Sequence, residues 1–200
     1  MLTPPACSAP LSPQDSTIGR PSWEYSATLY AYWFPQEDFF GLPIVTGDHG
    51  HLHVEGRYNY EDLKTLSLFA GWNFFFSPGP EIRLSPMIGA VAGRTNGVAP
   101  GLEADILYEI LELYAEWEYL FNIEDHTGNF SYLWSELTVS PADWFYAGFV
   151  AQRTRVYATE LEVSRGVLAG VGWDIVTASL YVLDTGGVHP LWIFALSAEW

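Results

Sequence analysis

The last ten residues of the chain, Leu191 to Trp200, alternate strictly between two kinds of side chain. One row carries the only charge of this segment, Glu199. The other row is mostly large and apolar, and comprises Trp192, Phe194, Leu196, Ala198 and Trp200. A strand whose two faces meet different surroundings alternates in this way. A half-buried strand of a soluble sheet is compatible with the pattern, and a membrane β-barrel requires it, because one face meets lipid and the other a polar interior.

The composition favours the membrane alternative. Hydrophobic residues make up 49% of the chain and charged residues 16%, against a usual charged share of about 25%. Aromatic residues are abundant, with 9 Trp, 12 Tyr and 12 Phe, as expected where rings lie at two membrane interfaces. No stretch approaches the roughly 18 consecutive apolar residues of a membrane helix. A closed barrel is the other structure that satisfies its backbone in lipid.

The same alternation recurs along the chain in segments separated by turn signals. Trp23 to Phe34 and Leu111 to Phe121 are clear examples. The Glu- and Leu-rich stretch from Glu103 to Tyr119 has good helix propensity, but a helix would scatter its glutamates over every face. As strands, the stretch places Glu112, Glu116 and Glu118 in one row, so we expect strands here.

The sequence therefore predicts an all-β fold, a single antiparallel up-and-down transmembrane β-barrel over residues 23–200, after a flexible Pro-rich tail over residues 1–22. The clear segments give an odd number of strands, whereas bacterial single-chain barrels nearly always have an even number. The short segment from Phe39 to Thr46, which contains Pro43, is a loop or a weak strand. Counting it gives about 12 strands, with 10 as the alternative.

From Trp23 to Trp200 the chain resembles the outer-membrane β-barrel proteins of Gram-negative bacteria. The resemblance rests on the repeated apolar and polar rows, the aromatic strand ends and the terminal W-I-F-A-L-S-A-E-W. It implies a place in the outer membrane, with the lipid bilayer and the outer-membrane assembly machinery as partners. It also implies that the C-terminal residues are the assembly signal, namely Phe194, Leu196, Ala198 and Trp200. The pattern is architectural and names no particular family.

Charged residues in the inner rows predict a lumen network. Its expected acids are Glu55, Glu103, Asp105, Glu112, Glu116, Glu118, Glu136, Glu162 and Glu199, and its expected bases are Arg57, Arg83, Arg153 and Arg155. Charges in a narrow lumen are paired or hydrated. The network either fills a closed, structural barrel or lines a narrow passage for small cations or polar solutes. The net charge of −16 argues against binding of nucleic acid.

A weaker pattern is the histidine run H-G-H-L-H, from His49 to His53. On one strand these imidazoles would share a face with Glu55, so His51 and His53 are candidate metal ligands. The competing interpretation places His49 in the Gly47–Gly50 turn and the other imidazoles in an ionic lumen. We expect no cofactor.

Two other functions remain open at this point. An enzyme acting on lipid or peptide at the extracellular rim could use Ser135 beside Glu136, with His126 or His189 from loops, but the spacing requires no such set and no G-x-S-x-G is present. A soluble calyx-like barrel that binds an apolar ligand would need the alternation inverted, with the apolar rows inside. We expect a barrel without catalysis.

Overall fold

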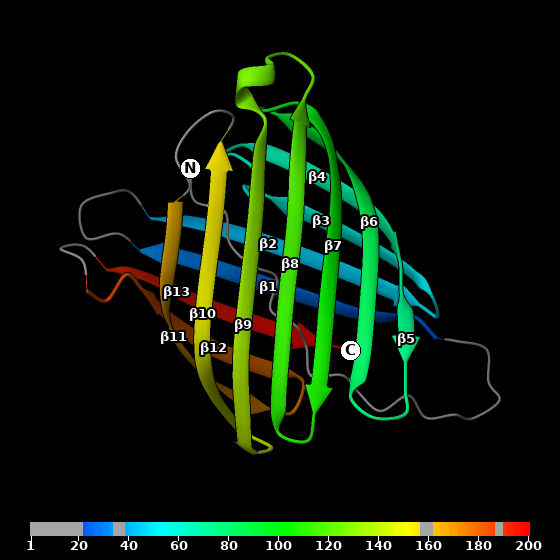
Figure 1. Ribbon diagram of the computed structural model, residues 1–200, viewed down its shortest axis with the longest axis vertical. Coiled ribbons are helices and arrows are strands. Elements are labelled where there is room, and N and C mark those ends of the chain that lie inside the picture. The colour runs from blue at the N-terminus through cyan, green and yellow to red at the C-terminus, as the bar shows by residue number, and fades with distance from the viewer. Residues whose placement is uncertain (1–21, 34–38, 157–161, 187–189) are drawn as a thin grey trace.

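The computed structural model describes residues 22–33, 39–156, 162–186 and 190–200, and these form almost entirely strands (Figure 1). The tail over residues 1–22 lies outside the described residues, except for Ser22. The strands are β1 (Glu24–Trp33), β2 (Phe40–His49), β3 (Leu52–Tyr58), β4 (Thr65–Trp72), β5 (Phe74–Phe76), β6 (Glu81–Gly93), β7 (Gly97–Tyr108), β8 (Leu111–Asn122), β9 (Phe130–Ala142), β10 (Phe145–Val156), β11 (Glu162–Trp173), β12 (Val176–Leu183) and β13 (Leu191–Glu199).

These strands close into an up-and-down barrel. From β1 to β4 and from β6 to β13 each strand pairs antiparallel with the next, and the pairs β1–β13 and β4–β6 close the sheet. The strands β4 and β5 pair with consecutive stretches of β6 in one register, so they form a single line interrupted at Asn73. The result is a closed barrel of twelve antiparallel strands plus the short extension β5, which confirms the predicted fold class.

The segment of uncertain character near the N-terminus is a full strand. The strand β2 pairs with β1 along Phe40 to Asp48, and Pro43 faces outward opposite Leu29. The predicted turn over Gly47–Gly50 is wrong in position, because β2 continues to His49 and the turn follows at Gly50 and His51. The backbone at Gly50 has a φ of 62°, which glycine adopts readily.

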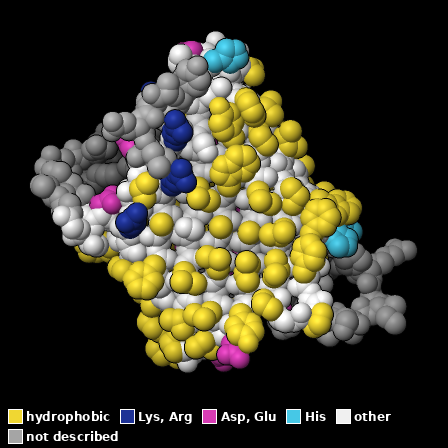
Figure 2. Space-filling view, viewed as in Figure 1, with side chains coloured by type: hydrophobic (Ala, Val, Ile, Leu, Met, Phe, Trp, Pro, Cys, Tyr) yellow, Lys and Arg dark blue, Asp and Glu magenta, His cyan; other side chains and the backbone are white. Residues whose placement is uncertain are grey.

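The apolar rows of the described strands face outward, and Figure 2 shows them on one side of the barrel. In β8, for example, Leu113 and Trp117 are exposed whereas Tyr114, Glu116 and Glu118 are buried. The C-terminal strand follows the same rule, with Phe194 and Leu196 exposed and Ile193 buried. The inverted alternation that a calyx with an apolar interior requires is therefore absent from the described strands.

The two ends of the barrel differ in the length of their connections. One end, here called the turn rim, holds the C-terminus and the short connections at residues 50–51, 109–110, 143–144 and 174–175. The opposite end, the loop rim, holds the connections at residues 59–64 and 123–129, the latter with a 3-10 helix, η1 (His126–Gly128). No described helix is long and apolar enough to cross a membrane. Short turns at one rim and long loops at the other are typical of outer-membrane barrels.

A leucine that is exposed on the outer face in the middle of a strand can be used to test whether this face meets lipid. Leu137 lies near the middle of β9 and pairs with Leu113 and Phe149 on the outer face. We expect Leu137→Arg to lower the free energy of unfolding by about 2–4 kcal/mol, because an arginine near the bilayer midplane is poorly solvated. Urea unfolding of the barrel refolded into lipid vesicles measures this, with Leu137→Met as the control. Equal stability of the two variants would show that this face does not meet lipid.

Candidate functional site

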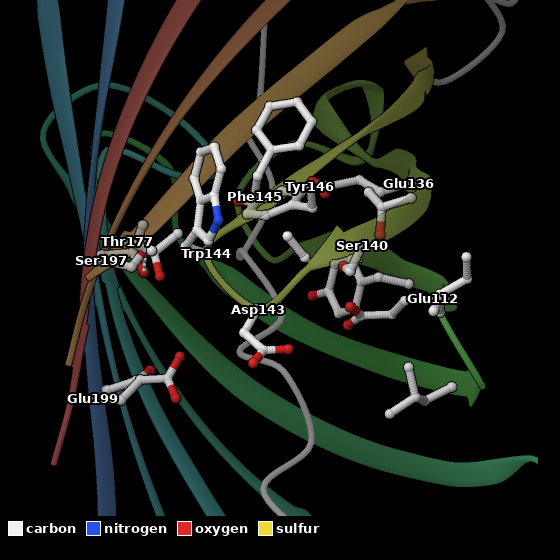
Figure 3. Close-up of a pocket in the computed structure, with 18 of the residues that line it drawn as sticks. Glu112, Glu136, Ser140, Asp143, Trp144, Phe145, Tyr146, Thr177, Ser197 and Glu199 are labelled. Carbon is white, nitrogen blue, oxygen red and sulfur yellow. Dashed lines mark hydrogen bonds between the residues drawn. The ribbon is translucent and has the colours of Figure 1, made fainter. Parts of the chain in front are cut away.

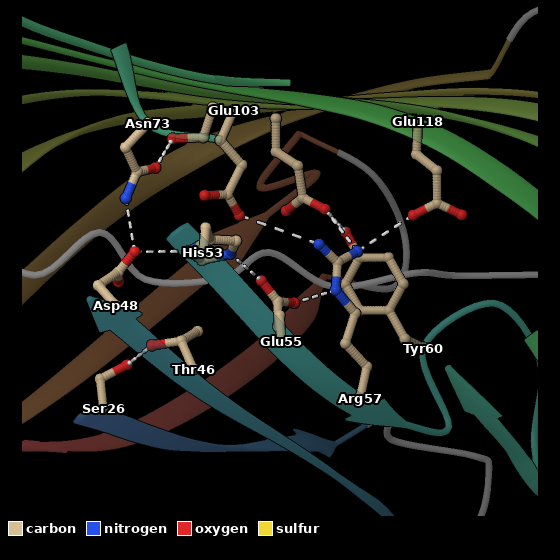
Figure 4. A network of polar contacts seen from close by, with 12 residues as sticks. Ser26, Thr46, Asp48, His53, Glu55, Arg57, Tyr60, Asn73, Glu103 and Glu118 are labelled. Carbon is tan, nitrogen blue, oxygen red and sulfur yellow. Dashed lines mark hydrogen bonds and ion pairs between the residues drawn. The ribbon is translucent and has the colours of Figure 1, made fainter. Parts of the chain in front are cut away.

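The interior of the barrel is the candidate site, because charged side chains from strands far apart in sequence meet there (Figure 4). The strand β3 contributes every second residue, namely His53, Glu55 and Arg57. The strands β7 and β8 contribute Glu103, Asp105, Glu116 and Glu118, each buried. The alternation of side chains along a strand fixes this arrangement, since residues two apart share a face.

Arg57 is the centre of the network. Its guanidinium Nη1 lies 2.7 Å from Glu116 Oε1 and 3.1 Å from Glu118 Oε2, and its Nη2 lies 3.9 Å from Glu103 Oε1. Its Nε donates to Glu55. The planar fork of an arginine suits such a cluster, because it presents several donors to separate carboxylates at once. All of these side chains are almost completely removed from solvent.

Aromatic rings surround this ion cluster. The guanidinium carbon of Arg57 lies 4.2 Å from the ring centre of Tyr60 and 4.4 Å from that of Phe69, distances at which a cation is attracted to a ring. The Tyr60 hydroxyl donates to Glu116 at 2.6 Å, and the Tyr114 hydroxyl lies 3.3 Å from both Glu103 and Glu116. Salt bridges and rings together fill this section of the lumen, which we call the Arg57 cluster.

The connection between β3 and β4, residues 59–64, folds inward to complete the cluster. Asn59 and Lys64 have φ values of 62° and 60°, and the Asn59 side chain accepts from the Lys64 backbone N–H at 2.7 Å. This tight closure buries Tyr60 and Glu61 between the two ends. Burial raises the pKa of the Glu61 carboxyl above its ordinary value, and Ser67 donates to that carboxyl. Neither Tyr60 nor Glu61 could be predicted as a lumen residue from the sequence, because side chains in a connection normally face solvent.

A second set of contacts runs from the cluster toward the turn rim. His53 Nδ1 lies 2.9 Å from Asp48 Oδ1, and His53 Nε2 lies 3.5 Å from Glu55 Oε2. Asn73 donates to Asp48 at 2.6 Å and accepts from Ser85 at 2.5 Å. The break between β4 and β5 thus places a buried amide inside the barrel. At the same end, Arg83 forms an ion pair with Asp105 at 2.5 Å.

The two candidate metal ligands occupy different places. His51 lies in the turn after β2, where its ring stacks on Trp72 and Nδ1 lies 2.7 Å from the Asn73 carbonyl. His53 instead joins Glu55 and Glu103, with ligand atoms all within 4.8 Å of one another. The fold therefore does not bring His51 and His53 together as ligands of one metal ion. Arg57 contacts both glutamates of the alternative set, so a metal ion would compete with its guanidinium.

A cavity of about 310 Å³ opens below the cluster at the turn rim (Figure 3). We call it the acidic vestibule. Its carboxylates come from opposite sides of the barrel: Glu112 and Glu136 lie on β8 and β9, Glu199 lies on β13, and Glu109 and Asp143 lie in turns at the turn rim. Glu136 accepts from the Trp134 indole N–H at 2.8 Å. Hydroxyl groups of Thr177 and Ser197 and the rings of Trp144 and Tyr146 complete the wall, and no Lys or Arg lies among the lining residues that the structure describes.

Two arginines expected in the lumen lie elsewhere. Arg153 and Arg155 are exposed, whereas their neighbours Gln152 and Thr154 are buried, so the lumen assignment of both arginines is wrong. The inner row of β10 is fixed by pairing with β9, where Gln152 lies opposite the buried Trp134. Glu162 lies opposite Thr154 and so belongs to the inner row, but it is exposed at the loop rim and forms no described contact with the cluster.

The residues considered for catalysis are not brought together. Ser135 faces outward and its hydroxyl donates to the Ala151 carbonyl, whereas Glu136 faces the lumen. His126 lies in η1 at the loop rim, and His189 lies outside the described residues. Adjacent residues of one strand point to opposite faces, so Ser135 and Glu136 cannot act as a nucleophile and its base.

A closed twelve-stranded barrel with an apolar outer face and an ionic interior has the architecture of the outer-membrane β-barrel proteins. Solved structures of porins share this fold. A KdgM porin matches with a TM-score of 0.63 and 9% sequence identity, covering 86% of this chain and 98% of that chain. A KdgM porin in complex with disordered oligogalacturonate matches with a TM-score of 0.66 and 10% identity, and a NanC porin with 0.64 and 8%, both at the same coverage. No protein-family model and no curated protein matches the sequence.

Proposed function

We propose that this protein lies in the bacterial outer membrane, with its turn rim in the periplasm, and forms a narrow passage that favours small cations. The observation that carries the proposal is the charge of the interior. The described inward acids are Asp48, Glu55, Glu61, Glu103, Asp105, Glu112, Glu116, Glu118, Glu136 and Glu199, and the described inward bases are Arg57, Arg83 and His53. Carboxylates confined in excess attract counterions, because the low-dielectric wall strengthens their field.

The excess of acidic side chains in the interior also argues against a passage for acidic sugars. One of the similar porins is described in complex with oligogalacturonate, a chain of sugars that each carry a carboxylate. The acidic vestibule would repel such a polyanion at its mouth, and the Arg57 cluster leaves little room for a sugar ring. The shared fold supports a porin-type role, and the interior charge supports the opposite ionic preference.

The section filled by the Arg57 cluster limits what can pass. Arg57, Tyr60, Glu116 and Glu118 are each at most 1% exposed, so any conducting path must run between closely packed side chains. We therefore expect a small conductance and exclusion of solutes larger than hydrated ions. Passage is a better explanation than catalysis, because Ser135 and Glu136 lie on opposite faces of β9 and no other described set joins a nucleophile to a base in the vestibule.

Planar bilayer recording tests the proposal. The barrel refolded from detergent should produce discrete current steps, and in a KCl gradient the reversal potential should have the sign of a cation-selective passage. Boiled protein is the control, since a barrel that has unfolded cannot conduct. Absence of current above this background would contradict the passage and leave a closed structural barrel. Anion selectivity would contradict the proposed role of the acids.

A further inference from the structure

Three arginines gather on the outer face of the barrel near the loop rim. Arg153 and Arg155 lie on β10, and Arg165 lies on β11, all of them exposed. Figure 2 shows Lys and Arg side chains gathered on the upper left of its view, where these two strands lie, beside an otherwise largely apolar face. We call these three residues the outer arginine patch.

The strand register places the three side chains within reach of one phosphorylated group. Arg153 lies opposite Val163, and Arg165 lies opposite Ala151, so Arg153 and Arg165 are diagonal neighbours, with Cβ atoms roughly 7–8 Å apart. Arg155 follows Arg153 by two residues on the same face, which is about 6–7 Å along the strand. Arg155 and Arg165 are four strand positions apart, about 13 Å, so the three long side chains can contact separate phosphates of one headgroup.

The height of the patch matches a lipid headgroup layer. Arg165 lies eight residues before Trp173, the exposed aromatic residue at the turn-rim end of β11. Eight residues of strand rise about 26 Å, which a tilt of about 40° reduces to about 20 Å along the membrane normal. The apolar band of such barrels is about 25 Å tall. Arg165 therefore lies about 5 Å inside the upper boundary, within reach of a long side chain, and Arg153 and Arg155 lie closer to the loop rim.

Ordinary interfacial snorkelling does not explain the distribution of these residues. Snorkelling cations are expected all around a barrel, but every outward Lys or Arg in the described strands belongs to this patch. Arg57 and Arg83 lie inside, and Lys64 and Arg94 lie in connections at the loop rim. No acidic side chain among the described residues forms an ion pair with the patch, whereas the exposed Arg94 pairs with Asp62. Within the described part of the chain, the patch is thus a group of positive charges without an acidic ion-pair partner, on a chain of net charge −16.

From this geometry we infer that the outer arginine patch is a binding site for a membrane lipid with a multiply phosphorylated headgroup, held from the outer leaflet against β10 and β11. The acyl chains of the lipid would lie on the apolar residues below, which include Phe149, Val167 and Val171. The inference relies on the proposed orientation in the outer membrane, but it does not rely on conduction through the lumen.

Native mass spectrometry of the detergent-solubilised full chain tests the site. The probe is a glucosamine disaccharide lipid that carries two phosphates (lipid A), and the comparison lipid has the same acyl chains without phosphates. We expect bound lipid A at concentrations where the phosphate-free lipid does not bind. Replacing each arginine with glutamine should weaken binding about fivefold, and replacing all three about a hundredfold.

A matched control separates the patch from general charge at this rim. The double variant Arg153→Gln/Arg155→Gln loses two positive charges from the patch, and Lys64→Gln/Arg94→Gln loses two from nearby connections. Only the first should weaken lipid binding, while both keep the heat-modifiable gel migration of a folded barrel. An equal loss of lipid binding in the two double variants would overturn the inference. So would binding of the phosphate-free lipid as strong as that of lipid A, or displacement of lipid A by millimolar inorganic pyrophosphate. An unchanged conductance in the patch variants keeps this test independent of the proposed passage.

Discussion

Replacing Arg57 with alanine should lower the free energy of unfolding by about 3–5 kcal/mol, the usual cost of removing one partner from a buried ion cluster. Arg57 is the only guanidinium within ion-pair distance of Glu55, Glu103, Glu116 and Glu118 in the part of the chain that the structure describes. Without it, these almost completely buried carboxylates face one another with no guanidinium between them. Urea unfolding of the barrel refolded into lipid vesicles measures the loss.

Removing carboxylates at the same time distinguishes charge from packing. If the loss arises from uncompensated charge, Arg57→Ala combined with Glu116→Gln and Glu118→Gln should be more stable than Arg57→Ala alone. Arg83→Ala is the matched control, because Arg83 forms an ion pair with one carboxylate, that of Asp105, and is partly exposed. Its loss should be clearly smaller. An equal loss in the two arginine variants, or no recovery in the triple variant, would show that the cluster acts by filling space.

Most of the fold could be predicted because a barrel in lipid leaves a direct signature in sequence. Its outer row must be apolar at every second residue, and this requirement identified β1, β8 and β13 from their alternation alone. It also favoured strands over a helix at Glu103 to Tyr119, where propensity indicated the reverse and the structure shows β7 and β8. The short segment with Pro43 could also be counted as a strand, since bacterial single-chain barrels nearly always have an even number of strands.

The errors occurred where alternation carries little information. In β10 the residues from Phe145 to Val150 are apolar or glycine on both faces, and the pairing with β9 is irregular between Phe145 and Ala147. Periodicity therefore could not show which row faces the lumen, and a preference for inward charges placed Arg153 and Arg155 on the wrong face. Strand pairing, which the sequence does not reveal, settles the question.

The composition of the site was harder to predict than its location. The row of His53, Glu55 and Arg57 was visible in the sequence, but its partners were not, because Glu103, Glu116 and Glu118 reach it across the lumen. The role of residues 59–64 was also hidden. Nothing in a loop sequence indicates that Tyr60 and Glu61 fold into the barrel, since this depends on the space that the surrounding strands leave.

Neutralising the acidic vestibule should remove most of the preference for cations. In a tenfold KCl gradient an ideally cation-selective passage has a reversal potential of about 59 mV, and we expect the wild-type barrel to approach this limit. The triple variant Glu112→Gln, Glu136→Gln and Glu199→Gln keeps the shape of the wall and replaces three of its five carboxyl groups with neutral amides. Its reversal potential should fall clearly below that of the wild type, because the permeability ratio of cation to anion should drop by about tenfold, or about 1.4 kcal/mol.

The size of this effect follows from the position of the charges. A monovalent ion about 8 Å from a carboxylate gains about 2 kcal/mol at an effective dielectric constant of about 20, and salt at 0.15 M screens this over about 8 Å. Carboxylates on β8, β9 and β13 surround the entering ion, so their contributions add. Acids in exposed connections are screened by solvent, and the control variant Glu124→Gln, Asp125→Asn and Asp174→Asn should therefore keep the wild-type reversal potential. If the two triple variants changed selectivity equally, net charge would determine the preference, and the vestibule would not be its source.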